Sequence, residues 1–201
     1  MNSRSREHFE NLYRHDPDPW DFAVDRYEQD RYAALLSHVP ACRYQRVFEP
    51  GCSVGVLTSQ LARRCRHVLA IDIAEAAVNR ARDRCRHLSN VELRRSDLSS
   101  VDPPTEPFDL VVFSEIGYYF DCDDLARELT VLRNRVTPEG RLVAQHWIGQ
   151  SPDHALNGFA VHDQLGWALR HWDHRVHQVR PDSGRDGYVL DVWDRPPGAL
   201  R

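Results

Sequence analysis

The residues best suited to chemistry lie at 49–55, where the sequence reads Glu49-Pro50-Gly51-Cys52-Ser53-Val54-Gly55. This segment follows a short apolar run and precedes a helical pattern, so it is predicted to join a strand to a helix. Glycine lets a ligand approach the backbone, and free N–H groups at the start of a helix attract a carboxylate or a phosphate. The segment therefore predicts a ligand-binding loop at residues 51–55.

Two familiar patterns compete for this loop. A dinucleotide site needs three glycines in the order G-x-G-x-x-G, and Gly51-x-Ser53-x-Gly55 lacks the third glycine. The same five residues match G-x-S-x-G, the turn that presents the serine nucleophile of α/β-hydrolases. That fold normally places an oxyanion loop and several strands before the turn, whereas here only helical patterns precede it. Both interpretations stay open at this point.

Acidic residues at the ends of the next two predicted strands favour a third interpretation. Asp72 ends an apolar run 21 residues beyond Gly51, where a carboxylate can accept hydrogen bonds from both hydroxyls of a ribose. Asp97, with Leu98 beside it, follows the next run, where an acid and backbone groups can meet the edge of an adenine. Ligands of open parallel sheets bind beyond the carboxyl ends of the strands, so these segments should converge. The combination favours a site for S-adenosylmethionine.

The elements that must position these residues alternate between apolar runs and helical patterns. Such alternation is typical of an α/β protein with a mostly parallel, twisted sheet and helices on both faces. The turn residues Pro181-Asp182-Ser183-Gly184 between two strand-like runs predict a C-terminal antiparallel hairpin. Strands are predicted near 47–49, 67–72, 91–94, 108–113, 141–145, 174–180 and 188–194, and helices near 55–65, 74–87, 123–136 and 158–171.

Residues 1–40 are predicted to form two helices with a break between them. The run Asp16-Pro17-Asp18-Pro19-Trp20 imposes an extended turn, because a residue before proline is pushed out of the α region. A second amphipathic helix follows and stops before Pro40. We expect a single domain over 1–201, made of an N-terminal helical cover (1–40), a cofactor-binding core (41–150), and a C-terminal helix and β-hairpin (151–201).

Composition narrows the class of protein. The 201 residues carry a net charge of −4, which argues against the electrostatic footprint of a nucleic-acid-binding surface. No apolar stretch approaches the ~20 residues that cross a bilayer, and the first residues lack the apolar core of a signal peptide. Five cysteines without a CxxC pair are expected to be free thiols. We expect a cytoplasmic protein that binds neither nucleic acid nor membrane, as a monomer or homodimer.

One histidine pattern could suggest a metal. His171-x-x-His174-x-x-His177 has the spacing of metal ligands, but it crosses a predicted junction between a helix and a strand. Its imidazoles are expected to face solvent, and no metal site is predicted.

The chain resembles the class I S-adenosylmethionine-dependent methyltransferases and, more narrowly, is similar to the nodulation protein S (NodS) family of N-methyltransferases. The broader likeness lies in 49–55, Asp72, 96–98, 108–111, 114–115 and 137–140. The narrower likeness lies in Tyr13-Arg14-His15-Asp16-Pro17-Asp18-Pro19-Trp20-Asp21-Phe22, 27–28, 31–32, 51–58, 114–119, 146–147 and 160–162. It extends over nearly the whole chain to about residue 165.

The resemblance implies a Rossmann-like fold, S-adenosylmethionine as cofactor and S-adenosylhomocysteine as product. It implies that Asp72 with Ile73 holds the ribose and that Asp97 with Leu98 meets the adenine. The residues implied on the methionine and ribose side are Glu49, Gly51, Ser53, Gly55 and Ser114, and those implied in the N-terminal cover are Trp20, Tyr27 and Arg31. Arg31 suits the cofactor's carboxylate, because a guanidinium matches a carboxylate in bidentate fashion.

The chemistry of methyl transfer favours nitrogen as the acceptor. Exposing the lone pair of an amine with a pKa near 10.4 costs about 4.6 kcal/mol at pH 7, whereas a hydroxyl near 15.7 costs about 12 kcal/mol. The candidate bases are Glu115 and His146, and the candidates for acceptor binding are Tyr118, Tyr119 and His162. The resemblance points to an amino sugar or oligosaccharide as the small-molecule acceptor. A hydroxyl or carboxylate acceptor, or a serine hydrolase using Ser53, is the alternative.

Overall fold

The computed structural model describes residues 3–98, 107–181 and 184–198. Two compact units make up the chain, Met1–Asp102 and Pro103–Arg201, and each is taken separately. The division between residues 102 and 103 falls inside the predicted cofactor-binding core of 41–150. This division does not test the prediction of a single domain.

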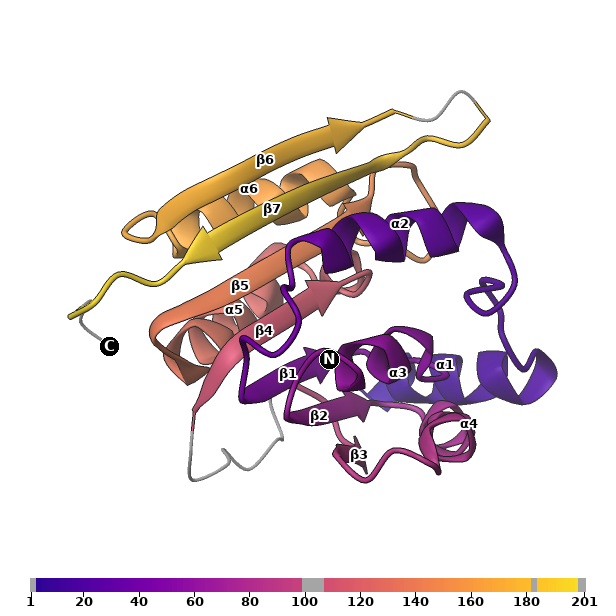
Figure 1. The fold of residues 1–201 in the computed structure, drawn as a ribbon. Coiled ribbons are helices and arrows are strands. Elements are labelled where there is room, and N and C mark those ends of the chain that lie inside the picture. Colours follow the sequence, from indigo (N-terminus) through magenta and orange to yellow (C-terminus); the bar gives the residue numbers. More distant parts are fainter. Residues whose placement is uncertain (1–2, 99–106, 182–183, 199–201) are drawn as a thin grey trace. The chain divides into compact units, whose positions relative to one another are not determined.

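The first unit contains three parallel strands in the order β3-β2-β1 (Figure 1). Their bounds are β1 Arg46–Pro50, β2 His67–Asp72 and β3 Val91–Arg95. The register pairs Pro50 with Ile71 and Asp72 with Arg95, so the three carboxyl ends lie at one edge. Strands β1 and β2 are buried almost throughout, in agreement with the apolar residues 47–48 and 68–71 at their centres.

The described part of the first unit contains four helices: α1 Ser3–His15, α2 Arg26–Ser37, α3 Val56–Ala62 and α4 Glu75–Cys85. Helix α4 packs against β2, β3 and α3, and α1 packs against α4. The close approach of α3 and α4 depends on Gly55, which precedes α3 with a φ of +78°. A Cβ at this position would lie only 2.9 Å from the Cβ of Ala81, so a larger residue would push the helices apart.

The second unit contains four strands in the order β4-β5-β7-β6, of which β4 and β5 are parallel and the others antiparallel. Their bounds are β4 Phe108–Ser114, β5 Val136–Trp147, β6 Asp173–Arg180 and β7 Tyr188–Asp194. Helices α5 Cys122–Arg135 and α6 Gly158–Ala168 pack against one face of this sheet (Figure 1). A short 3-10 helix, η1 Gly117–Tyr119, follows β4.

The predicted strands and helices, including the C-terminal antiparallel hairpin β6–β7, are confirmed where the structure describes them. Asp182 and Ser183 of the predicted turn lie outside the described residues. One boundary differs, because β5 begins at Val136 and not near residue 141. Pro138 has no N–H for a helix, and a register shift after the pairing of Phe108 with Val136 accommodates 137–140 as a bulge.

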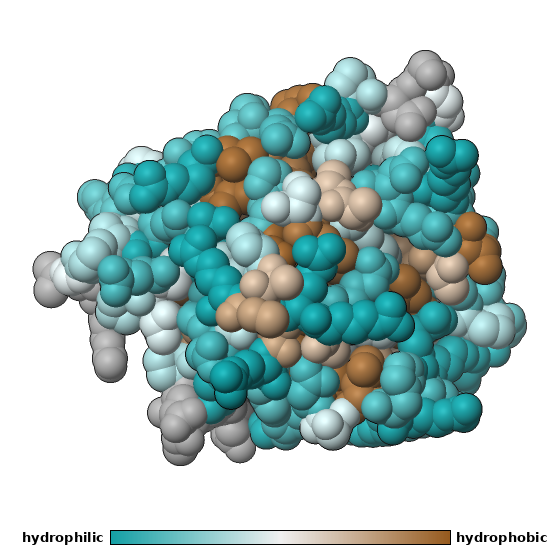
Figure 2. Space-filling model, viewed as in Figure 1, coloured by the Kyte–Doolittle hydropathy of each residue, from teal (hydrophilic) through white to brown (hydrophobic). Residues whose placement is uncertain are grey.

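The core is aliphatic and aromatic, and the surface is polar. Fully buried side chains include Phe48, Leu61 and Leu69 in the first unit, and Phe108 and Leu125 in the second. The face seen in Figure 2 is mostly hydrophilic, with scattered apolar side chains. All five cysteines are free thiols, as predicted. None of the helices in the described residues is long and apolar enough to span a membrane.

Candidate functional site

The predicted loop at 51–55 connects directly to the neighbouring strand. The N–H groups of Gly51 and Cys52 both donate to the carbonyl oxygen of Ile71, at 2.8 and 2.9 Å. Gly51 and Gly55 have φ values of +78°, and Ser53 has a φ of +49°. A non-glycine residue in this region stores strain of about 1–3 kcal/mol, which proteins retain mostly at functional sites. The loop therefore combines strain with a close approach to the end of β2.

Asp72 is the acidic residue that the sequence places at the end of β2, and the residue is 7% exposed. Oδ2 accepts the N–H of Ser53 and Oδ1 accepts the N–H of Ala74, both at 2.9 Å. Burial raises the pKa of Asp72 to about 6, although these backbone N–H groups act to lower it. The N–H of Ser96 donates to the Asp72 carbonyl oxygen, so the loops after all three strands meet at this residue.

Glu49, the residue before the loop, is a buried carboxyl. Desolvation raises its pKa to about 8, with a smaller contribution from the nearby charge of Asp72 and an opposing one from the Thr58 hydroxyl. Within the described residues, Oε2 of Glu49 is buried and accepts no hydrogen bond. A cationic group beside it would favour the ionised form, so this carboxyl is suited to an ammonium.

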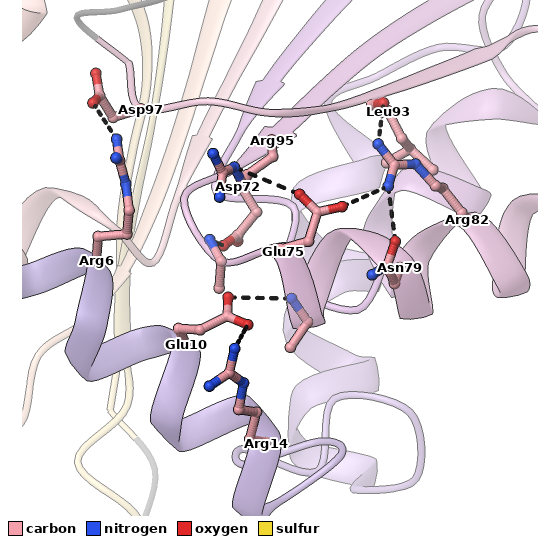
Figure 3. A network of polar contacts seen from close by, with 12 residues as sticks. Arg6, Glu10, Arg14, Asp72, Glu75, Asn79, Arg82, Leu93, Arg95 and Asp97 are labelled. Atoms are coloured by element: carbon pink, nitrogen blue, oxygen red, sulfur yellow. Dashed lines mark hydrogen bonds and ion pairs between the residues drawn. The ribbon is translucent and has the colours of Figure 1, made fainter.

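Helix α1 covers this edge through one face, whose contacts were not predicted from the sequence. Arg6 Nη2 lies 3.3 Å from Asp97 Oδ2, Glu10 accepts the N–H of Ala76 at 3.3 Å, and the Tyr13 hydroxyl donates to Ser53 Oγ at 2.7 Å. Figure 3 shows Arg6 and Glu10 pointing from α1 toward Asp97 and the start of α4. The spacing i, i+4, i+7 was the available signal, because it puts these three side chains on one helical face.

Of the three residues predicted in the cover, Trp20 lies in the segment that joins α1 to α2, and Tyr27 and Arg31 lie in α2. Trp20 is half-buried with its ring 5.7 Å from that of Tyr13, which in turn bonds Ser53. Arg31 is buried, and its Nη1 donates to both carboxylate oxygens of Glu28 at 3.0 Å. Its guanidinium also lies over the ring of Tyr27. Arg31 is thus charge-paired within α2.

The remaining residues predicted for the adenosine end lie at the same edge of the first unit. Leu98 is buried, and the side chain of Asp97 is 11% exposed. Ile73 is half-buried next to Asp72, so part of its apolar side chain remains accessible. An apolar surface beside two carboxylates is the combination that a nucleoside needs, since its ring stacks on hydrocarbon and its hydroxyls and amine seek acceptors.

In the second unit, Ser114 and Glu115 lie at the end of β4. Glu115 has a φ of +59°, and its carboxylate accepts the Tyr118 hydroxyl at 2.8 Å and the N–H of Trp147 at 3.0 Å. Ser114 Oγ is buried and makes no hydrogen bond within the described residues. A strained, half-buried carboxylate with two donors is held in one orientation, as a group that must meet a substrate requires.

Tyr118 and Tyr119, predicted to bind the acceptor, form an aromatic cluster in η1. Tyr118 is 5% exposed and stacks on His154, with ring centroids 3.8 Å apart. Tyr119 is half-buried, and its ring meets the edges of both Tyr118 and His154. Tyr118 therefore positions Glu115, and Tyr119 is the more accessible of the two rings.

His146 and His162 form a buried relay. The N–H of Gly117 donates to His146 Nε2 at 3.1 Å, so in the neutral ring the proton is on Nδ1, which donates to His162 Nε2 at 3.1 Å. His162 Nδ1 then donates to Asp191 Oδ2 at 2.5 Å. A Cβ on Gly117 would lie 2.9 Å from His146 Nε2 and 2.4 Å from Val161 Cγ1, so this contact requires glycine. Both imidazoles have both nitrogens engaged, which favours a positioning role.

Comparison with solved structures shows the fold. The N-methyltransferase NodS from Bradyrhizobium japonicum WM9, crystallised with S-adenosyl-L-homocysteine, superposes with a TM-score of 0.79 at 22% identity, covering 96% of this chain and 97% of that chain. A Pseudomonas syringae protein proposed to be a methyltransferase matches with a TM-score of 0.71 at 32% identity, over 85% of this chain and all of that one. The fold is that of the Rossmann-like methyltransferases, as predicted.

The sequence itself identifies the family. The Nodulation protein S (NodS) family model matches residues 6–192, and the chain belongs to this family. Nodulation protein S of Sinorhizobium fredii is 29% identical over 130 residues. That match covers 63% of this chain and 59% of the relative, so it spans about three-fifths of the curated protein's length.

Proposed function

We propose that the protein is an S-adenosylmethionine-dependent methyltransferase whose first unit holds the adenosyl end of the cofactor. The observation that carries the proposal is the arrangement at Asp72. Its carboxylate stands at the end of β2, joined by hydrogen bonds to the 51–55 loop and to the start of α4, with Asp97 after the adjacent strand. A ribose bound by a carboxylate beyond a parallel strand needs this geometry.

An unsatisfied group of the first unit fits another part of this cofactor. Buried Glu49 Oε2 makes no hydrogen bond within the described residues. The ammonium of the cofactor's amino-acid end would supply donors to Glu49. Membership of the NodS family, with a relative crystallised with S-adenosyl-L-homocysteine, supports the same cofactor.

The chemistry that the cofactor supplies when bound is a methyl group already activated on a positively charged sulfur. The acceptor's lone pair would form the new bond to this carbon while the carbon–sulfur bond breaks and its electron pair leaves on sulfur, giving S-adenosylhomocysteine. The protein's own task is to align the acceptor, which can contribute about 7–11 kcal/mol. Glu115 is suited to hold an acceptor amine and to take up its proton, because its carboxylate is fixed by Tyr118 and Trp147. His146 acts through Gly117 as a positioning residue.

We infer an amine as the methyl acceptor, on an amino sugar or an aminated oligosaccharide. The lower cost of deprotonating an amine and the N-methyltransferase activity named for the NodS relative both support this. A panel of amines and a panel of hydroxyl compounds, each incubated with S-adenosylmethionine, would be compared by mass spectrometry. A mass gain of one methyl confined to hydroxyl compounds would replace this acceptor with an O-methyl acceptor.

The cofactor proposal is tested by titration calorimetry with S-adenosylhomocysteine. Asp72→Asn should weaken binding at least tenfold, because hydrogen bonds to a charged group are worth about 1.5–3 kcal/mol. Asp83→Asn, at an exposed position of α4, is the matched control and should bind as the natural protein does. Equal affinity of both variants would remove Asp72 from the site.

The hydrolase alternative has less support. Ser53 Oγ is bonded to the Tyr13 hydroxyl, and no histidine contacts it among the described residues. A serine nucleophile needs an adjacent base. A fluorophosphonate probe should therefore leave the protein unlabelled, and labelling that disappears in Ser53→Ala would favour the hydrolase.

A further inference from the structure

We propose that His174, His177 and Asp191 form a binding site for a divalent transition-metal ion of the zinc type. His174 Nε2 lies 2.6 Å and His177 Nδ1 lies 2.9 Å from the same oxygen, Asp191 Oδ1. All three ligand atoms lie within 4.8 Å of one another. Two imidazoles and one carboxylate are a ligand set that zinc and its neighbours in the first transition row prefer.

A bulge in the hairpin brings the two imidazoles to the same face. Residues three apart in a regular strand point to opposite faces. Here the register shifts between His174 and Val176, so that His174 lies opposite Trp193 and His177 lies opposite Asp191. Since Asp191 and Trp193 are two residues apart on β7, all four side chains share one side of the hairpin. Bulges commonly re-aim side chains in this way.

The cluster is open on one side and supported on the other. The side chains of His174 and His177 are 45% and 58% exposed, whereas that of Asp191 is 3% exposed. His174 is stacked on Trp193, with planes 12° apart. The second oxygen of Asp191 is held by His162, which is the outer-shell support that metal-binding carboxylates characteristically have. A metal could enter from solvent onto a carboxylate that is already oriented.

The geometry needs only a small adjustment to accept the ion. Ligands roughly 2.1 Å from a tetrahedral zinc stand ~3.4 Å apart. The two nitrogens would therefore move less than ~1 Å away from Asp191, which exposed side chains can do by rotation, and the ion would replace their N–H protons. Water would fill the fourth position. No metal was predicted here, because the pattern His171-x-x-His174-x-x-His177 does not include Asp191, which lies on a separate strand.

The test is calorimetric titration of chelator-treated protein with zinc chloride alone. A Cys42→Ser/Cys122→Ser background removes the two exposed thiols as competing ligands. We expect one zinc per chain, at least tenfold weaker binding in His174→Gln and in His177→Gln, and unchanged binding in His171→Gln, an exposed neighbour outside the cluster. Circular dichroism would check that each variant is folded.

Cobalt provides a second measurement that does not depend on enzymatic activity. Bound Co²⁺ should give visible absorption of a tetrahedral site with nitrogen and oxygen ligands, and this absorption should be lost in the His174→Gln/His177→Gln variant. Absence of saturable zinc binding would overturn the proposal and leave the cluster as a hydrogen-bonded group around Asp191. Binding that persists in the double variant would overturn it equally.

Discussion

Glu49 and Asp72 are buried carboxyls at the same edge of the first unit, with different surroundings. Burial raises the pKa of Glu49 to about 8 and that of Asp72 to about 6. Asp72 accepts two backbone N–H groups, which favour its ionised form and offset part of the desolvation. At neutral pH, Asp72 is therefore mostly ionised, while Glu49 is mostly protonated until a cation approaches.

The raised pKa of Glu49 predicts how stability depends on pH. Because the folded value exceeds the ordinary 4.5, folding takes up a proton between about pH 4.5 and 8, so this group lowers stability as pH rises through that range. At pH 7 the cost is about 3 kcal/mol. Glu49→Gln should therefore match the natural protein near pH 4.5 and exceed it in free energy of unfolding at pH 7 and above, as measured by urea denaturation.

A matched control for this measurement is Glu7→Gln, at an exposed position of α1. It should follow the pH profile of the natural protein throughout. If Glu49→Gln instead loses stability at pH 8, the carboxylate is stabilised in the fold and our reading of its environment is incorrect.

Glu115 should be the residue with the largest effect on turnover. Replacing it with glutamine keeps the shape but removes the proton acceptor, so kcat should fall about 10²- to 10⁴-fold. Tyr118→Phe removes one donor to the same carboxylate and should have a smaller effect on kcat. Steady-state kinetics with the identified acceptor is the measurement, and unchanged kcat in Glu115→Gln would exclude it as the base.

At the scale of elements, α1 does more than bury an apolar face. Arg6 contacts the loop after β3, Glu10 the first turn of α4, and Tyr13 the loop after β1. One helix therefore contacts all three segments that follow the parallel strands, on which the proposed cofactor site depends. The three side chains share one face of α1 because of helical periodicity, and their partners lie close together because they follow the ends of parallel strands.

The hydrogen bond between Tyr13 of α1 and Ser53 of the 51–55 loop can be measured as a coupling energy. A double-mutant cycle of Tyr13→Phe and Ser53→Ala should give about 0.5–1.5 kcal/mol of interaction in urea denaturation, the net value of a buried hydrogen bond. Tyr13→Phe alone should be destabilising, because it leaves the Ser53 hydroxyl without its donor. A coupling near zero would mean that the two hydroxyls do not interact in solution.

At the scale of the whole molecule, the sequence predicts one domain. The structure has two compact units, with the division after Asp102, and unfolding experiments can test whether they behave as one domain. Trp20 is in the first unit and the other four tryptophans are in the second. In Trp20→Phe, fluorescence therefore reports residues 103–201 alone, while far-ultraviolet circular dichroism reports the whole chain. A single domain should give coincident urea midpoints by both probes, and separated midpoints would mean that the two units unfold independently.

Much of the fold was accessible from the sequence, because local signals specify it. Short apolar runs that alternate with helical patterns predicted the strands, and the segment Asp16-Pro17-Asp18-Pro19 predicted the end of α1. The predicted ends of the strands also placed Asp72 at the end of one strand and Glu115 after another, as the structure does. The start of β5 at Val136 was not predicted, since a bulged strand has no regular period.

By itself, the sequence determined the family, the order of the elements and the residues at the strand ends, since these depend on neighbours in the chain. Tertiary structure decided which groups each of these residues meets. Arg31 pairs with Glu28, Tyr13 bonds Ser53, and Asp191 gathers three histidines from two elements. Hydrogen bonds reach only about 3 Å, so partners 40 residues apart become known only when the backbone has brought them together.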